Sequence, residues 1–485
     1  MSEPDTEIES TGLDRGYKPP PTRKILALAA GGSFAQVLFL VGFRIQLYAL
    51  VALGLSAFLV AVFMGVFTAV DIINEYFVGY LSDKSTIFTK RLGKRFIFVI
   101  GGGIGTALTF LLIFLPVWET KPEGGLVNPG QALVAIIWLS IAVSIWDTLQ
   151  TMNELNSRAV TPDLIRDEDS RAKLQLASVT LSTLILIIGI ILIPLLLSIY
   201  GGVTNPRAYF MMSLIIGLIY IFIFLPIRAY GIWEPQEMRE FRYEFDKLKK
   251  EKEPLWNPGK RAIKSKNWMS YVIAYLAYGL TTRMLTLGYD LYTVHVLEID
   301  IAYASLPLLA LALGAFFFGA FSYLLLKKYG SKQTFQIGAI ITIFGFFLMI
   351  FTVDIFTLTL FSFIAGLGIG AQSTSRELMG IEAIDKDTLR YGKREEAQYY
   401  AIYQIVSATG KFLSAFLFAI VVAVFAYEPT LGARNTPTAK FGLLFYISII
   451  PMIIYILAAI FIWKFFDITK EMAVEHKEKL LKLGH

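Results

Sequence analysis

A short group of oxygen-bearing side chains interrupts a long apolar stretch near residue 70. Asp71, Asn74 and Glu75 are spaced i, i+3 and i+4, so a helix carries all three on one face. Carboxylate and amide oxygens suit Na⁺, and two neighbouring carboxylates can instead share one proton, because like charges raise the pKa of one of them. The group therefore predicts a cation site for Na⁺ or H⁺, with an ion pair that locks helices together as the alternative.

A lysine lies in the middle of a second apolar stretch. Lys411 is about 13 residues from either end of the stretch 398–425. Its side chain is too short to reach water at the ends, so we expect it to face the protein interior and to meet a carboxylate. Such an amine either competes with the bound cation, which would make Lys411 a coupling residue, or forms a permanent salt bridge.

Two more pairs of polar residues share a helix face at a spacing of seven. Asp147 and Glu154 form one pair, and Arg283 and Asp290 form the other. Carboxylates accept hydrogen bonds from sugar hydroxyls, and the ring of Trp146 could stack on a sugar, although packing is the more frequent role of such an indole. We therefore predict these five residues as substrate contacts. For Arg283 and Asp290, a gate or an interhelical structural pair is the alternative.

The elements that carry these residues are membrane-spanning helices. The 485 residues are 55% hydrophobic and 17% charged, which excludes an ordinary soluble domain and a disordered chain. A bilayer core of about 30 Å requires about 20 apolar residues per helix. Twelve such stretches are present, near 25–48, 53–81, 95–116, 131–154, 173–199, 208–230, 268–294, 303–326, 334–353, 355–380, 398–425 and 441–465.

The basic residues indicate how the spans are oriented. With both termini in the cytoplasm, 37 of the 44 Lys and Arg fall in cytoplasmic segments, which agrees with the positive-inside rule. We expect a multi-pass protein of the plasma membrane. The basic residues flank spans instead of forming one stripe, which argues against binding to nucleic acid.

A charged central segment divides the spans six and six. The predicted organisation is a cytoplasmic tail (1–24), an N-terminal six-helix bundle (25–230), a cytoplasmic linker (231–267), a C-terminal six-helix bundle (268–465) and a cytoplasmic tail (466–485). The halves repeat weakly, since Gly79 to Ser82 matches Gly319 to Ser322, and both are followed by a basic segment that contains a glycine. Parallel six-span repeats are typical of a transporter whose site lies between the halves.

The motifs of five segments resemble a known family. Residues 71–75, 79–83, 91–95, 161–164 and 392–396 are similar to the major facilitator superfamily, and more closely to its glycoside–pentoside–hexuronide:cation symporter branch. The resemblance implies an all-α membrane protein with twelve transmembrane helices in two pseudo-symmetric six-helix bundles. It also implies cation-coupled symport of a sugar or glycoside by alternating access. Glu75 stands where the branch usually has Asp, which leaves the choice between Na⁺ and H⁺ open.

The resemblance also assigns roles to single residues. Because it places the second and eleventh spans opposite each other, Asp71 or Glu75 is the expected partner of Lys411. Glu154 best matches the acidic residue of the fourth span that helps to hold sugar or cation. A gate on the cytoplasmic side is expected to comprise Asp83, Arg91, Lys94, Arg95, Arg171, Glu377 and Arg394, although these charges could also serve the positive-inside pattern alone.

Other classes of protein remain as alternatives. One is a carrier of a lipid or other amphiphile with the same fold, and another is a membrane sensor that does not transport. With no cysteine and three histidines, the chain offers little for an intramembrane enzyme or a thiolate or histidine metal site. We expect a monomer in the lipid bilayer that binds a small molecule, with no cofactor other than the coupling ion.

Overall fold

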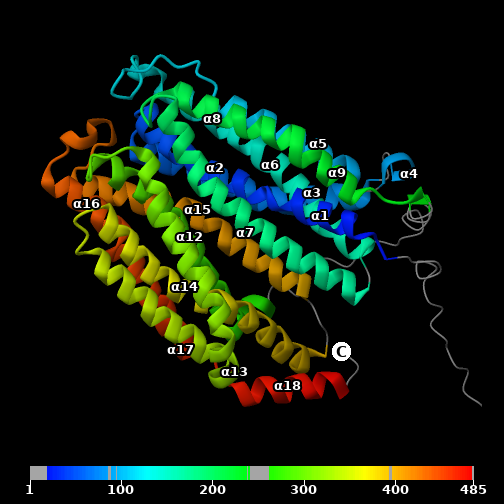
Figure 1. Cartoon of the computed structure of the whole chain (residues 1–485). Coiled ribbons are helices and arrows are strands. Elements are labelled where there is room, and N and C mark those ends of the chain that lie inside the picture. The colour runs from blue at the N-terminus through cyan, green and yellow to red at the C-terminus, as the bar shows by residue number, and fades with distance from the viewer. Residues whose placement is uncertain are drawn as a thin grey trace, which may run out of the picture.

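The computed structural model describes residues 19–85, 89–93, 95–165, 167–236, 239–240, 261–392 and 396–482. Long helices dominate these ranges and run roughly parallel or antiparallel in two groups (Figure 1). We call the side where α4 and α18 lie the inner side, which the basic residues predict to be cytoplasmic, and the opposite side the outer side.

The N-terminal half contains the first group of helices. In chain order they are α1 (Thr22–Ser33), α2 (Ala35–Leu47), η1 (Tyr48–Ala52), α3 (Ala57–Lys84), α4 (Thr89–Leu92), α5 (Phe96–Ile113), η2 (Pro129–Gln131), α6 (Ala132–Leu164), α7 (Glu168–Ile199), α8 (Pro206–Ile219), η3 (Tyr220–Phe224) and α9 (Leu225–Ile232). The π-helical turns η1 and η3 continue their neighbours. As a result, α1 to η1 and α8 to α9 each form a single crossing.

The C-terminal half contains the second group. Its helices are α12 (Lys266–His295), η4 (Ile301–Ala304), α13 (Ser305–Met349), α14 (Ile355–Tyr391), α15 (Glu396–Phe425), η5 (Pro429–Arg434), α16 (Pro437–Ile447), α17 (Ile449–Phe465) and α18 (Lys470–Lys482). Most of the predicted linker, residues 241–260, lies outside the described ranges.

The predicted set of twelve crossings is consistent with this architecture. Within the described chain, ten helical segments are long and apolar enough to span a membrane. One of them, Ile301–Met349, contains two crossings, because Gly330 with φ +80° divides α13. α12 adds another helix of 30 residues, whose Arg283 and Asp290 reduce its apolar character. The all-α fold with two six-helix bundles is therefore confirmed.

Polar residues just before several helices determine where those helices begin. Ser56 accepts a hydrogen bond from the backbone N–H of Leu59 at the start of α3, and Ser265 does the same for Trp268 in α12. Asp354 forms a capping box with Thr357 at the start of α14. Each cap satisfies a backbone donor that the first helical turn leaves without a partner.

The structure repeats locally where the two halves repeat in sequence. The Ser82 hydroxyl donates to the carbonyl of Gly79, and the Ser322 hydroxyl donates to the carbonyl of Gly319. The glycines that follow, Gly93 and Gly330, have φ of +96° and +80°, a left-handed conformation that favours glycine. Both turns redirect the chain on the inner side.

The buried apolar side chains are distributed differently on the two sides. The largest cluster draws residues from both halves, including Val41 and Ile45 of α2 and Leu285 and Tyr289 of α12. Towards the inner side, the buried apolar residues of the described chain form separate clusters, one in the N-terminal half and two in the C-terminal half. The apolar core is therefore shared between the halves mainly towards the outer side.

Candidate functional site

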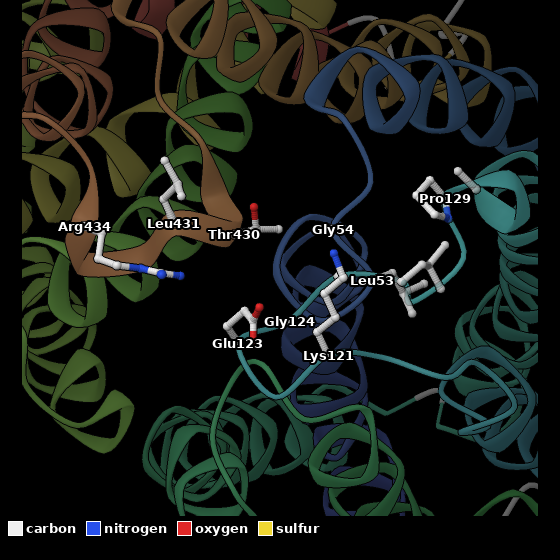
Figure 2. Close-up of a pocket in the computed structure, with 12 residues that line it drawn as sticks. Leu53, Gly54, Lys121, Glu123, Gly124, Pro129, Thr430, Leu431 and Arg434 are labelled. Atoms are coloured by element: carbon white, nitrogen blue, oxygen red, sulfur yellow. The ribbon is translucent and has the colours of Figure 1, made fainter.

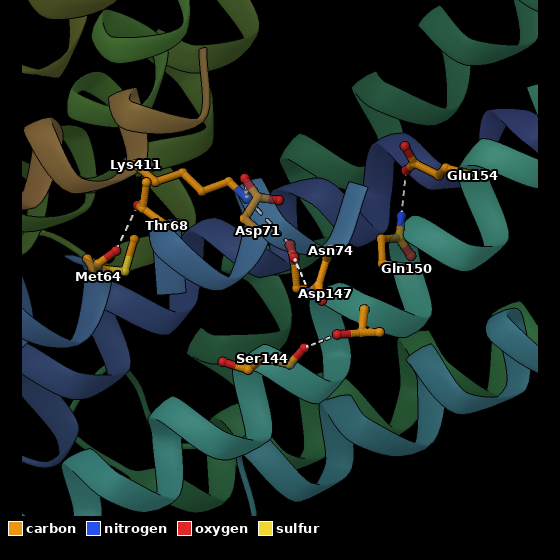
Figure 3. Close-up of polar contacts among 10 residues, drawn as sticks. Met64, Thr68, Asp71, Asn74, Ser144, Asp147, Gln150, Glu154 and Lys411 are labelled. Carbon is orange, nitrogen blue, oxygen red and sulfur yellow. Dashed lines mark hydrogen bonds and ion pairs between the residues drawn. The ribbon is translucent and has the colours of Figure 1, made fainter. Parts of the chain in front are cut away.

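Three helices bring a lysine and two carboxylates together between the halves. The Lys411 Nζ on α15 lies 2.8 Å from the Asp71 Oδ2 on α3 and 3.4 Å from the Asp147 Oδ1 on α6. Figure 3 shows the lysine reaching across from its own helix to Asp71. The expected ion pair of Lys411 with Asp71 is therefore present, and Asp147 is a second partner.

Asn74 connects the two carboxylate-bearing helices. It lies one turn after Asp71, and its Nδ2 donates to the Asp147 Oδ2 at 3.3 Å (Figure 3). Asp71, Asn74 and Asp147 are each more than 90% buried, so bulk water cannot replace these contacts freely. The side chain of Glu75, the third member of the predicted cation site, lies outside the described residues.

An aromatic ring also contacts the lysine. Its Nζ lies 4.3 Å from the centre of the Phe67 ring, which offers a further favourable contact for a cation. Two negative groups share this one ammonium in a medium of low dielectric constant, where charge–charge interactions are strong. An additional small cation, or a proton on one carboxylate, would balance the charge of the three groups.

Arg283 places a second positive charge near this site. Its guanidinium lies 5.4 Å from the Phe39 ring centre and 5.0 Å from that of Phe43, both on α2. Asp71 and Asp147 act on its charge from further away. Among the described residues, no carboxylate lies within ion-pair distance of Arg283.

Asp290, which was predicted to share a helix face with Arg283, instead contacts a residue of the other half. Its carboxylate forms an ion pair with Arg44 of α2, and both side chains are almost completely buried. Arg44 lies near the outer end of the first span and is not among the predicted site residues. The structure instead places it against the other half of the molecule.

Trp146 lies behind Phe67, a contact of Lys411, with the two ring centres 6.4 Å apart, and Glu154 lies farther from the lysine. The Trp146 ring is 6% exposed and packs 5.1 Å from the Phe110 ring centre, within the largest apolar cluster. This position favours the packing role over sugar stacking. Glu154 accepts a hydrogen bond of 2.5 Å from Gln150, about two helical turns from Asp147 (Figure 3).

The predicted gate residues with described contacts connect helices within one half. Arg95 donates to the Ser82 Oγ at 3.0 Å and to the Asn156 Oδ1 at 2.9 Å, which ties together the inner ends of α3, α5 and α6. Glu377 of α14 accepts a hydrogen bond of 3.0 Å from the Tyr275 hydroxyl of α12.

The other predicted gate residues have fewer described contacts. The Nε of Arg171 donates to the carbonyl of Ile165, and the carbonyl of Arg91 accepts from Arg239. The side chain of Asp83 lies outside the described residues, as do Lys94 and Arg394 entirely. The gate between the halves therefore stays a prediction.

A hollow lined partly by charged residues lies at the outer seam, away from these residues. Its volume is about 300 Å³, and charged residues from both halves line it, with Lys121 and Glu123 on one side and Arg434 on the other (Figure 2). Gly54, with φ +61°, lies against Gly125 and Thr430 at this seam. The hollow marks the outer contact between the halves and is separate from the Lys411 site.

The described residues contain no group of three or more His, Asp or Glu side chains that could hold a metal ion. The oxygen cluster around Lys411 comprises two carboxylates and one amide. It suits a proton or a monovalent cation better than a tightly bound divalent metal.

The overall shape is similar to that of solved transporter structures. The nucleoside transporter NupG is 13% identical, with a TM-score of 0.62 over 92% of this chain and 99% of that one. A bacterial homologue of the human lysosomal transporter Spinster, inward-facing and occupied, is 13% identical, with a TM-score of 0.65 over 92% and 97%. The D-xylose–proton symporter is 14% identical, with a TM-score of 0.56 over 92% and 98%. At such identities the likeness establishes the fold alone.

The sequence comparison goes further than the fold. No curated protein sequence matches the chain. However, the family model described as MFS/sugar transport protein matches residues 29–470, nearly the whole chain. Together with the two six-helix bundles, this match identifies a membrane transporter of the major facilitator type. The chain belongs to the MFS/sugar transport protein family.

Proposed function

We propose that this transporter carries a sugar or glycoside together with a cation, by alternating access. The observation that carries the proposal is the position of Lys411, whose ammonium is held by Asp71 and Asp147 of the opposite half. An ammonium in this place is a built-in competitor for any cation that binds the same two carboxylates. Competition of this kind links cation binding to the contact between the halves.

The coupling step follows from the charges. When Na⁺ or H⁺ binds to Asp71 or Asp147, that carboxylate is neutralised and Lys411 keeps only the other one as a partner, which weakens the contact between the halves. The two halves are then free to rearrange, and an occluded site with compensated charge is less costly in the membrane. Asn74, which bonds Asp147, would provide an amide oxygen to Na⁺ after a change of orientation.

The polar groups near Lys411 support a hydroxyl-rich substrate. Asp147 can accept hydrogen bonds from hydroxyl groups, and Arg283 has N–H groups without a carboxylate partner among the described residues. A lipid or another amphiphile would have to bring apolar chains against these charges, which is unfavourable. We therefore favour a sugar or glycoside over a lipid, in a monomer of the plasma membrane with both termini in the cytoplasm.

Transport into proteoliposomes tests the proposal. The purified protein is given an imposed Na⁺ or H⁺ gradient, and uptake is measured for a panel of neutral and acidic sugars and glycosides. We expect at least one sugar to accumulate against its own gradient with one of the two cations. Uptake of a labelled lysolipid but of no sugar would support the amphiphile carrier, and the absence of any uptake would support the sensor.

A further inference from the structure

A glycine in the middle of α12 lies beside open space. Gly279 is near the centre of this helix of 30 residues, where glycine is generally less stable than alanine by about 0.5–1 kcal/mol. Close packing often explains such a glycine, as at Gly380, where an added Cβ would lie 2.9 Å from the Tyr271 ring. At Gly279, no atom of a neighbouring described element lies within 4 Å of an added Cβ. Packing in this structure therefore does not account for this glycine.

Contacts between α12 and α15 place this space at the depth of the Lys411 site. A Cβ added to Gly410 of α15 would lie 3.8 Å from the backbone nitrogen of Leu280 of α12. Gly410 directly precedes Lys411, and Leu280 directly follows Gly279. Gly279 is therefore level with the lysine and with the two carboxylates that hold it.

The first span of the other half borders the same region. Arg283, one turn beyond Gly279 on α12, lies 5.4 Å and 5.0 Å from the ring centres of Phe39 and Phe43 on α2. Gly32 lies seven residues before Phe39 and shares its helix face. Gly32 also has no atom of a neighbouring described element within 4 Å of an added Cβ. Glycines of both halves thus border space on the inner side of the Arg283 contact.

We infer that Gly279 lines the substrate site and limits the size of the sugar or glycoside that the site admits. The inference rests on the proposed function, because the space lies beside the charges that would couple substrate to cation. A larger residue at position 279 would extend its side chain towards the bound ring. Arg283, one turn away, can donate hydrogen bonds to hydroxyl groups on that ring. The glycine lowers the intrinsic stability of the helix but leaves room for the substrate.

Side chains of increasing size at position 279 test the inference. Gly279→Ala, Gly279→Val and Gly279→Leu are compared in proteoliposomes, with the monosaccharides and disaccharides that the wild-type protein accumulates. We expect the half-saturating concentration to rise by about tenfold for Val and about a hundredfold for Leu, since overfilling a packed site costs about 1–3 kcal/mol. The increase should be larger for disaccharides than for monosaccharides, whereas the cation dependence of uptake should not change.

Gly101 provides a matched control. It lies inside α5, and the described residues leave the position of an added Cβ without a neighbour within 4 Å, as at Gly279. However, Gly101 shares its helix face with the exposed side chains of Ile104 and Leu108, which form an apolar outer surface. Gly101→Leu should leave the half-saturating concentration unchanged. An equal increase in Gly101→Leu would indicate a general effect on the helices and would overturn the inference.

Equilibrium binding separates a substrate site from helix packing in another arrangement of the halves. If Gly279 and Gly32 serve only to let the halves approach each other, Gly279→Ala should already block transport, while the affinity for sugar stays unchanged. That outcome would overturn the inference. A loss of sugar affinity that increases from Ala to Leu would support it, and size-exclusion chromatography checks that each variant is folded.

A thiol at position 279 provides a readout that does not require uptake. The natural chain contains no cysteine, so Gly279→Cys carries a single thiol. We expect a small water-soluble thiosulfonate to label it at least about tenfold faster than Gly101→Cys, and a transported sugar to slow the labelling. Rapid labelling without sugar uptake by the wild-type protein would contradict the proposed function and not the position of the space. A folded Gly279→Cys protein that is not labelled would overturn the inference, even if Gly279→Leu does not fold.

Discussion

The two ion pairs between the halves differ in their access to water and in the number of their partners. At the inner pair, the side chains of Lys411 and Asp71 are 13% and 12% exposed, and the amine has two carboxylates. At the outer pair, the side chains of Arg44 and Asp290 are 4% and 0% exposed, and the guanidinium has one. Under the proposed coupling, the inner pair would exchange one carboxylate partner for a cation without movement of the helices, whereas the outer pair would break only when α2 and α12 separate.

The largest effect is expected from removing the negative charge nearest to Lys411. Asp71→Asn should reduce cation-driven accumulation of substrate by about a hundredfold, near the upper end of typical coupling between two sites, while some substrate binding remains. Uptake into proteoliposomes measures the first, and equilibrium binding measures the second. Asp169→Asn, which breaks the exposed pair with Lys173, serves as the control. Unchanged accumulation in Asp71→Asn would contradict the proposed cation site.

Removing the ammonium of Lys411 should allow the cation to bind without promoting the movement of the two halves. In Lys411→Gln, Asp71 and Asp147 face each other without a competing positive charge, so we expect the apparent affinity for the coupling cation to rise by about tenfold or more. Substrate accumulation should fall at the same time, because the cation no longer displaces anything. The cation dependence of uptake tests both, and an unchanged affinity would mean that Lys411 does not compete.

Arg283 should matter to the substrate more than to the cation. Hydrogen bonds to a charged group contribute about 1.5–3 kcal/mol, so Arg283→Gln should raise the half-saturating concentration of substrate by about tenfold. Arg283→Lys should retain part of the affinity, since it keeps the charge. An equal loss of cation affinity in both variants would instead assign Arg283 to the inner ion pair.

The smallest effect is expected from breaking a third ion pair, which serves as the reference for the two pairs between the halves. The Lys440–Glu298 pair is partly exposed, and exposed pairs contribute only about 0–1 kcal/mol. Glu298→Gln should therefore leave the thermal stability and uptake almost unchanged. A large loss of stability would show that outer contacts within one half matter as much as those between the halves.

Much of the fold could be predicted from the sequence, because membrane spans have a simple physical signature. Apolar stretches of sufficient length revealed the crossings, and the repeated Gly–x–x–Ser segments indicated two related halves. A carboxylate partner for Lys411 could also be anticipated, since an amine in the middle of a span requires one, and the family resemblance pointed to Asp71 or Glu75. α12 was recognised even though Arg283 and Asp290 lower its hydropathy, because the flanking residues are apolar.

The partners within the site were harder to predict. Asp147 was expected to contact substrate, yet it shares the lysine with Asp71. Arg44 was not predicted as a site residue, yet it pairs with Asp290, 246 residues later in the chain. Helical periodicity shows which residues share a face, but not how each helix is rotated against its neighbours. That rotation depends on packing between segments that are remote in sequence.

The last helix, α18, is a suitable place for a probe that reports the movement of the two halves. The Lys470 Nζ donates to the carbonyl of Lys327 at 2.8 Å, and Lys386 pairs with Asp467 just before the helix. These contacts fasten α18 to α13 near its bend at Gly330 and to the C-terminal end of α14, both in the C-terminal half (Figure 1). A dye attached to α18 would therefore move together with the C-terminal half. Its distance from a second dye on α9 would follow each turnover in real time.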